Sequence, residues 1–158
     1  MPSLSSRREP VIAGAMLGFA SGILTWSGFT TLLLSLPPNA LPGWARSKWA
    51  KWVAIPSAVG EVVANATISS LPPRTSPPPL FGRAVMGATS GALAGRAAGS
   101  TMAGAIAGGL AAPVGAWVAT NGRARLSKSI PDIAVAVGET VVAAGLSRAG
   151  ARRTSRSS

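Results

Sequence analysis

Residues 10–45 read PVIAGAMLGFASGILTWSGFTTLLLSLPPNALPGWA, a stretch of 36 residues without a charged side chain. Residues 97–122 form a second uncharged run of 26 residues, rich in Gly and Ala. A helix of about 20 mostly apolar residues crosses the roughly 30 Å hydrocarbon core of a bilayer, so runs of this length are typical of membrane spans. The two runs therefore predict an all-α, integral membrane helix bundle.

The charged residues favour the same class of protein. Lys and Arg number 15 against four Asp and Glu, a net charge of +11, yet the mean hydropathy is +0.38. The basic residues gather in short clusters between the uncharged runs and at both ends of the chain. A nucleic-acid-binding protein would instead carry them along whole helices or strands. We therefore expect the basic clusters to contact anionic lipid headgroups of a bilayer, and we expect no nucleic-acid partner.

Missing residue types exclude much catalytic chemistry. The chain has no Cys and no His, so disulfides, thiolate nucleophiles and Ser-His-Asp catalysis within the chain are excluded. The only carboxylates are Glu9, Glu61, Asp132 and Glu139, which is too few for a multi-carboxylate metal site. We expect no enzyme, no cofactor and no metal site.

Prolines and charge clusters divide the chain into two membrane halves, 11–71 and 81–146, joined by a Pro-rich linker at 72–80. We expect basic tails at 1–10 and 147–158 to be disordered. The first half contains spans at 11–36 and 52–71 around an interfacial segment at 39–51, and the second contains segments at 81–95, 98–120 and 130–146. Segment 81–95 is short enough to be either a thin span or a re-entrant arm, so four to five spans are predicted.

Three Trp residues in and beside the interfacial segment predict its place at the membrane surface. Trp44, Trp49 and Trp52 lie among three basic residues. Trp favours the headgroup region, and Lys and Arg find anionic lipid there, so we interpret these Trp side chains as interfacial anchors.

Glycine recurs at every fourth position in three segments. The series are Gly14, Gly18 and Gly22; Gly87, Gly91, Gly95 and Gly99; and Gly104 and Gly108. This spacing puts small residues on one helix face, where two backbones can approach closely. We expect glycine-zipper packing within the bundle, and the same faces suit a homo-oligomer or a partner membrane protein.

An internal repeat links the two halves. Residues 58–66 (AVGEVVANA) and 136–144 (AVGETVVAA) are identical at six of nine positions, and each follows a Gly-rich run and a basic cluster. If segment 81–95 crosses the membrane, the copies point in opposite directions, as in the inverted repeats of many transporters. If that segment is re-entrant, the copies are parallel.

The repeat places one carboxylate in each half, Glu61 and Glu139, near the centre of a predicted span. A charge at the bilayer centre costs at least about 2.5–3.5 kcal/mol on insertion scales, so such residues face the bundle interior and have partners. The functional interpretation is a central polar or ion site made by both glutamates, with Asn65 one helical turn from Glu61 as a neighbour. The structural alternative pairs each glutamate with the other, or with Arg74, Arg83 or Arg96.

These motifs together resemble a known group of proteins. The Gly-rich first span, the mid-membrane Glu61, the LPPRT and PPPL motifs of 71–80, the R–MGA–SGALAG pattern of 83–95 and the late Glu139 are similar to a domain-of-unknown-function family of small bacterial integral membrane proteins. The resemblance covers about residues 11–148. It implies a multi-pass protein of the bacterial inner (plasma) membrane and supplies no activity. Family members often have an acidic pair at the second site, whereas Gly precedes Glu139 here, which argues against a two-carboxylate metal role.

The sequence favours a small transporter or channel-like protein with Glu61 and Glu139 at its central site. The alternative is a non-catalytic structural or assembly protein that binds partner helices through its Gly-rich faces. If five full spans are assumed, seven Lys and Arg lie on the N-terminal side and eight on the other, so charge does not fix the orientation.

Overall fold

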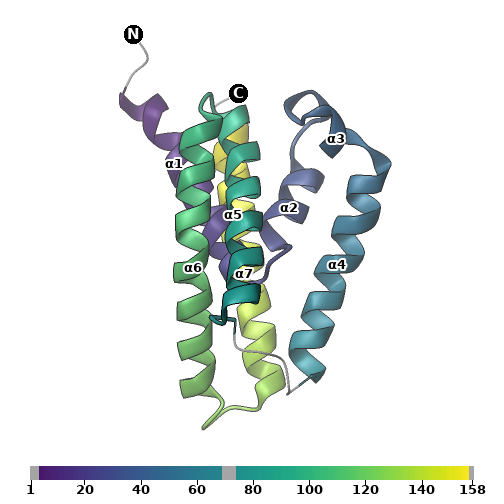
Figure 1. Ribbon diagram of the computed structural model, residues 1–158, viewed down its shortest axis with the longest axis vertical. Helices are drawn as coiled ribbons and strands as arrows, with labels where there is room; N and C mark the ends of the chain where they lie inside the picture. Colours follow the sequence, from purple (N-terminus) through teal and green to yellow (C-terminus); the bar gives the residue numbers. More distant parts are fainter. Residues whose placement is uncertain (1–3, 69–73, 157–158) are drawn as a thin grey trace.

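A computed structural model describes residues 4–68 and 74–156, and all regular structure in these ranges is helical (Figure 1). In chain order the elements are α1 (Leu4–Ile23), α2 (Ser27–Ser35), the 3₁₀ turn η1 (Pro38–Ala40), α3 (Gly43–Arg46), α4 (Lys48–Thr67), α5 (Pro77–Ala97), α6 (Thr101–Leu126) and α7 (Asp132–Arg156). The predicted all-α class is confirmed.

Helices α1, α5 and α6 pack together through glycine. Gly14 and Gly18 of α1 lie against Gly104 and Gly108 of α6, and Gly91 of α5 contacts the same two α6 residues. A Cβ atom built on Gly14 would lie 2.5 Å from the carbonyl oxygen of Gly104, which is closer than real Cβ atoms approach. The three backbones therefore touch directly, as they do in small-residue packing between membrane helices.

The predicted span 11–36 is not one helix. α1 ends at Ile23, and after a turn at 24–26 the chain reverses, so that Gly28 of α2 lies against Ser21 of α1. The sequence Thr-Trp-Ser-Gly at the turn contains weak helix formers, which lowers the cost of stopping α1 there. The uncharged run is therefore a helical hairpin, which hydropathy alone does not distinguish from a single long helix.

The hairpin reaches only part of the way along the bundle. α1 runs parallel to α6, and Gly22 near its end lies against Ala112 and Gly115, close to the middle of α6. From that level α2 returns toward the end where α1 begins (Figure 1). We call α1, the turn and α2 the re-entrant hairpin, because the chain enters the bundle and returns to the end at which α1 begins.

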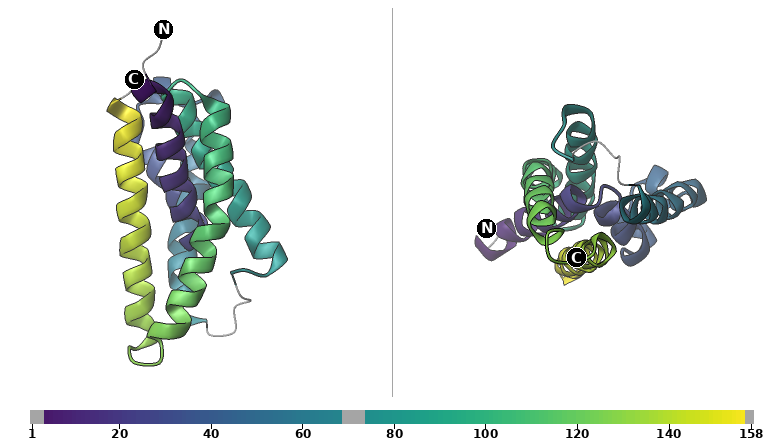
Figure 2. Two further views of the ribbon diagram at one scale, coloured as in Figure 1. Left: turned by 90° about the vertical axis from the view of Figure 1, so that its left-hand side faces the viewer. Right: turned by 90° about the horizontal axis from the view of Figure 1, so that it is seen from below.

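The four remaining long helices alternate in direction (Figures 1 and 2). The start of α1, helix α3, the turn at 98–100 and the end of α7 lie at one end of the bundle, which we call the terminal end. The end of α4 and the loop at 127–131 lie at the opposite end, the loop end. Because α4 runs toward the loop end and α7 away from it, the repeated segments 58–66 and 136–144 point in opposite directions.

Most of the two predicted disordered tails, 1–10 and 147–158, is helical instead. α1 and α7 extend through them to Leu4 and Arg156. The tails hold each other, because Glu9 of α1 pairs with Arg153 of α7 at 3.2 Å. Composition alone could not reveal this mutual contact.

The other predicted segments match helices with shifted ends. The segments 52–71, 98–120 and 130–146 correspond to α4, α6 and α7, while 39–51 contains η1, α3 and the first turn of α4. Residues 69–71 of the first segment and 72–73 of the predicted linker lie outside the described residues. α5 begins at Pro77, inside the predicted 72–80 linker, because proline is tolerated in the first turn of a helix. With 21 residues, α5 is longer than the predicted 81–95 arm.

Large apolar side chains cover the outside of the bundle. On α6 alone the exposed set comprises Met102, Ile106, Leu110, Val114, Trp117, Val118 and Leu126. Two helical stretches, α6 and residues 132–154 of α7, are long and apolar enough to cross a membrane, as judged by length and composition. The glycine packing at the centre leaves the large side chains to face outward.

We expect Gly18→Ala to destabilise the bundle, because its methyl group would overlap the backbone of Gly108. Overpacking of this kind costs about 1–3 kcal/mol or more, a fall of several degrees in the melting temperature. Thermal unfolding in detergent, followed by circular dichroism, measures the change. The control is Gly60→Ala on α4, since nothing lies within 4 Å of its added Cβ. Equal melting temperatures for the two variants would contradict the packing described here.

Candidate functional site: a charge network at a helix break

Two charged side chains bind the unpaired backbone groups at the turn of the re-entrant hairpin, where α1 ends and α2 begins. Glu61 of α4 accepts hydrogen bonds from the backbone N–H groups of Thr25 and Trp26, at 2.8 and 3.1 Å, at the start of α2. The Thr25 hydroxyl donates to the same carboxylate at 2.7 Å. No side chain at the N-cap position of α2 supplies such a cap, so the carboxylate from α4 replaces it and also suits the positive end of the helix dipole.

Arg83 of α5 provides the matching contact at the end of α1. Its Nη1 donates to the carbonyl oxygens of Gly22 and Ile23, at 2.8 and 3.0 Å. Its Nη2 lies 3.3 Å from the Glu61 carboxylate, and the two side chains are only 8% and 15% exposed. One ion pair therefore closes both helix ends at the break, with the cation on the carbonyl end and the anion on the amide end.

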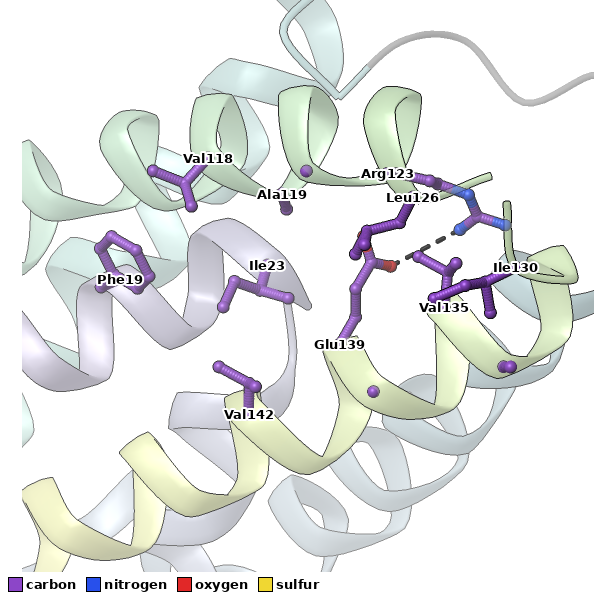
Figure 3. Close-up of a pocket in the computed structure, with 13 residues that line it drawn as sticks. Phe19, Ile23, Val118, Ala119, Arg123, Leu126, Ile130, Val135, Glu139 and Val142 are labelled. Atoms are coloured by element: carbon purple, nitrogen blue, oxygen red, sulfur yellow. Dashed lines mark ion pairs between the residues drawn. The ribbon is translucent and has the colours of Figure 1, made fainter. Parts of the chain in front are cut away.

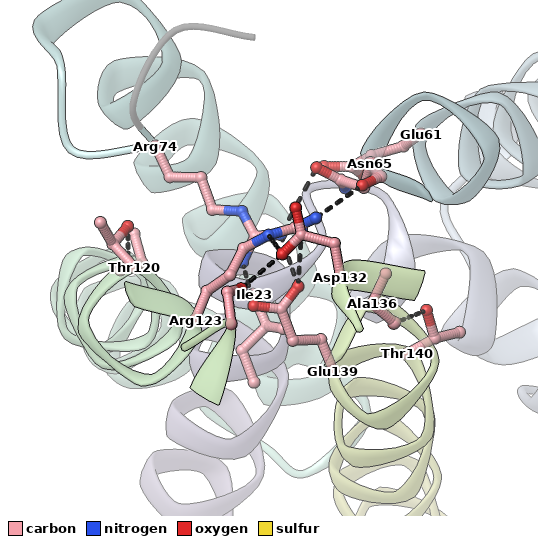
Figure 4. A network of polar contacts seen from close by, with 12 residues as sticks. Ile23, Glu61, Asn65, Arg74, Thr120, Arg123, Asp132, Ala136, Glu139 and Thr140 are labelled. Atoms are coloured by element: carbon pink, nitrogen blue, oxygen red, sulfur yellow. Dashed lines mark hydrogen bonds and ion pairs between the residues drawn. The ribbon is translucent and has the colours of Figure 1, made fainter. Parts of the chain in front are cut away.

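A second charge group lies next to the first, toward the loop end. Arg74 binds Glu139 of α7 through two hydrogen bonds, at 2.9 and 2.7 Å, and its Nη2 also lies 3.4 Å from the side-chain oxygen of Asn65. Arg123 of α6 lies 3.5 Å from Glu139 and donates to the backbone oxygen of Asn65 at 3.0 Å. Figure 4 shows these side chains converging from different helices.

The second group continues to the surface of the bundle. Arg123 lies 3.9 Å from Asp132, whose side chain is 60% exposed at the start of α7. We call the set from Asp132 to Arg83 the polar network; its members are Glu61, Asn65, Arg74, Arg83, Arg123, Asp132 and Glu139. Charged groups therefore lead from an exposed position at the loop end to the buried helix break.

The structure places both predicted glutamates off the helix centres. Glu139 follows the start of α7 by seven residues, or about 10 Å at 1.5 Å per residue. Glu61 precedes the end of α4 by six residues, or about 9 Å. Both therefore lie nearer the loop end, whereas the sequence placed them at mid-span, because the helices begin and end at other residues than predicted.

Glu61 and Glu139 each bind an arginine in place of each other. The structural alternative in the sequence analysis predicted Arg74, Arg83 or Arg96 as partners of the glutamates. Arg74 and Arg83 are such partners, whereas Arg96 is exposed at the terminal end. Asn65 does not bond to Glu61; its side-chain oxygen faces Arg74. The sequence analysis did not single out Thr25 or Arg123. Thr25 lies in the turn at 24–26, which hydropathy does not reveal, and Arg123 falls outside the predicted segment 98–120.

Two buried donors of the network have no acceptor among the described residues. They are Nε of Arg83 and Nδ2 of Asn65. By contrast, every oxygen of Glu61 and Glu139 accepts at least one hydrogen bond or ion pair. Both carboxylates are therefore held in place by donors from the protein.

Two cavities border the network on different sides. One, of about 350 Å³, lies between α1, α6 and α7 and is almost entirely apolar apart from the Arg123–Glu139 pair at one end (Figure 3). The other, of about 180 Å³, lies between α2, α4 and α7 and is lined by Glu61 together with hydroxyl side chains. The two glutamates therefore face separate cavities.

The predicted helix-packing and interfacial residues are placed as follows. Eight of the nine glycines lie against a neighbouring helix or turn; Gly99 has φ +92° in the turn between α5 and α6, where nothing lies within 4 Å of an added Cβ. Trp44, Trp49 and Trp52 are exposed near the terminal end, and Trp44 stacks on Phe29 of α2 with ring centroids 5.9 Å apart. Gly99 was predicted as a packing residue from the fourfold spacing, but its role is conformational, because a left-handed turn favours glycine.

Comparisons with known proteins assign neither a family nor a function to this chain. No family model, no curated protein and no solved structure matches this chain. The family resemblance drawn from the motifs therefore stays an expectation.

Removing one partner of the Arg74–Glu139 ion pair should lower the free energy of unfolding more than removing both partners. Glu139→Gln leaves the Arg74 charge without its bidentate partner, and we expect the free energy of unfolding to fall by about 3 kcal/mol. Adding Arg74→Gln should recover part of the loss. Unfolding by denaturant in detergent, read by circular dichroism, gives both values.

The matched control is Glu9→Gln, which breaks the more exposed pair with Arg153. We expect a change below about 1 kcal/mol, since exposed ion pairs contribute little. If the double variant is no more stable than Glu139→Gln, then Arg74 and Glu139 are not energetically coupled.

Proposed function

We propose that this protein is a multi-pass inner-membrane protein in which α4, α5, α6 and α7 cross the bilayer and the re-entrant hairpin enters from one side. The outward apolar side chains and the two long apolar helices support a lipid environment. Internal glycine packing supports it as well, because backbone contact replaces the hydrophobic force that lipid removes. The opposed directions of the two repeated segments agree with an inverted repeat.

The hairpin also changes the charge count on which orientation depends. Since the first apolar run returns to its own side, ten of the 15 basic residues belong to the terminal end: Arg7, Arg8, Arg46, Lys48, Lys51, Arg96, Arg148, Arg152, Arg153 and Arg156. Of the remaining five, Arg74, Arg83 and Arg123 are held in the polar network. Basic residues favour the cytoplasmic side, so the terminal end lies in the cytoplasm, with anionic lipid headgroups around it.

The function that the geometry supports best is transport of a small solute through the polar network. One observation carries this proposal: a helical hairpin whose two helix ends at the turn meet the Arg83–Glu61 pair beside a cavity. In secondary transporters, discontinuous helices and intramembrane charges form the substrate and ion sites. The polar network, which extends from exposed Asp132 at the loop end to the turn, is the part of the bundle where we place the solute.

The competing proposal of a structural protein that binds partner helices through glycine faces has less support. Gly91 and Gly95, which such a partner would contact, lie against α6 and the turn before it in the same chain. A partner would have to use the large outward side chains instead.

The orientation can be tested with single cysteines, because the chain has none of its own. We expect Asn39→Cys, between α2 and α3, and Thr101→Cys, at the start of α6, to react with a membrane-impermeant maleimide only after cells are opened. Ser129→Cys, in the loop between α6 and α7, should react in intact cells. Labelling of Asn39→Cys from outside while Thr101→Cys stays protected would show that the first apolar run crosses the membrane and would contradict the hairpin. Labelling of both from outside would reverse the orientation instead.

Transport can be tested in proteoliposomes that contain purified protein. We expect flux in a screen of monovalent cations, anions and small neutral solutes, followed by ion-selective electrodes and entrapped dyes. Glu61→Gln should reduce that flux at least tenfold, because the break loses its anion, whereas Glu9→Gln should leave it unchanged. Wild-type flux in the double variant Glu61→Gln, Glu139→Gln would exclude a role for the network.

A further inference from the structure

The smaller of the two cavities that border the polar network has no basic residue in its lining, although the network itself contains three arginines. It measures about 180 Å³ and lies between α2, α4 and α7, next to the helix break. None of its lining residues is Lys or Arg, and the polar ones are Glu61, Ser27, Thr30, Thr31 and Thr140. The cavity therefore combines a single carboxylate with hydroxyl groups from two helices.

Three of the four hydroxyl groups, those of Ser27, Thr30 and Thr140, present oxygen lone pairs, because their protons are already used. Ser27 donates to the Leu24 carbonyl at 2.8 Å, and Thr30 donates to the carbonyl of Ala54 at 3.2 Å. Thr140 donates to the carbonyl of Ala136 one turn earlier in α7, at 2.9 Å (Figure 4). A hydroxyl has one proton and two lone pairs, so each of these oxygens can act toward the cavity only as an acceptor.

Glu61 adds negative charge to this set of acceptors. Its Oε1 accepts from Thr25 and Arg83, whereas its Oε2 has one partner, the N–H of Trp26 at 3.1 Å. A carboxylate oxygen has two lone-pair directions, so Oε2 keeps one acceptor position. Arg83 uses its Nη atoms on the carbonyl end of α1 and on Oε1, and it does not line the cavity.

We propose that this cavity binds a small monovalent cation, either an alkali ion that keeps part of its water shell or a small primary ammonium. The inference rests on the proposed transport function, in which the cation is the substrate or the coupling ion. Hydroxyl and carboxylate oxygens are ligands of hard cations, and an ammonium group has three protons to donate to the three hydroxyl acceptors. The ligand sits between α2, whose start Glu61 holds, and α7.

The volume favours such ligands over a bare ion. A single water needs about 10–15 Å³ of cavity volume, so about 180 Å³ accommodates an ion with several waters, or an ammonium with a short alkyl group. The apolar part of the lining, from Leu24, Ala58, Val62 and Ala144, has room for that alkyl group.

The experiment is equilibrium binding of radiolabelled Na⁺ and of radiolabelled methylammonium to the full-length protein in detergent, with unlabelled Na⁺, K⁺ and methylammonium as competitors. We expect saturable binding of at least one of these cations. Thr140→Val keeps the side-chain shape, removes one oxygen and should weaken binding about tenfold. Glu61→Gln should abolish binding. Which competitor displaces the label at the lowest concentration tells an alkali ion from an ammonium.

The matched control is Thr89→Val on α5, because Thr89 makes the same bond to the carbonyl four residues earlier but lies outside the cavity. We expect unchanged binding in this variant. Equal binding in Thr140→Val and Thr89→Val, both checked for folding by circular dichroism, would overturn the assignment to this cavity.

Failure of the inference is separable from failure of the transport proposal. If folded protein binds none of the three cations while proteoliposomes still carry an anion or a neutral solute in a Glu61-dependent way, the cation site is refuted and transport stands. Saturable binding of chloride or acetate alone would instead point to the unused donors of Arg83 and Asn65. Absence of both binding and flux refutes the two proposals together.

Discussion

The ion pair between Glu61 and Arg83 is the contact on which the rest of the architecture depends. A helix that stops inside a bundle exposes carbonyl groups at one side of the break and amide groups at the other, and each costs free energy if it stays unsatisfied. Arg83 binds the two carbonyl oxygens and Glu61 binds the two amides, so one pair of opposite charges satisfies both ends. Without this pair, the amide groups of Thr25 and Trp26 and the carbonyl groups of Gly22 and Ile23 would lose these partners, and the turn at residues 24–26 would be less stable.

Close glycine packing makes that arrangement possible. α1 approaches α6 through Gly14, Gly18 and Gly22, and α5 contacts α6 from its own glycines, so the three helices occupy little width. α5 is thereby close enough to α1 for the Arg83 side chain to reach the carbonyl groups of Gly22 and Ile23. Substitution of a packing glycine and loss of the charge pair therefore act on the same feature, the position of α1 relative to its neighbours.

Much of this architecture follows from residue pattern, and the remainder depends on contacts that no local pattern contains. Uncharged runs and fourfold glycine spacing predicted helices and their packing faces, and scarcity of carboxylates drew attention to Glu61 and Glu139. The turn at 24–26 was not predictable from hydropathy, because the groups that stabilise it come from positions 61 and 83. Likewise, helical tails looked disordered by composition, since their stabilising contact joins Glu9 to Arg153 across the whole chain.

The re-entrant hairpin imposes an order on biosynthesis in the proposed membrane setting. Residues 24–26 leave the ribosome well before Glu61 and Arg83, so the break would meet lipid with its amide and carbonyl groups open, at several kcal/mol each. The nascent hairpin must therefore stay at the membrane surface, or in the insertion machinery, until the chain through α5 has been made. Only then can α1 reach its final depth, which makes the first segment synthesised one of the last to be placed.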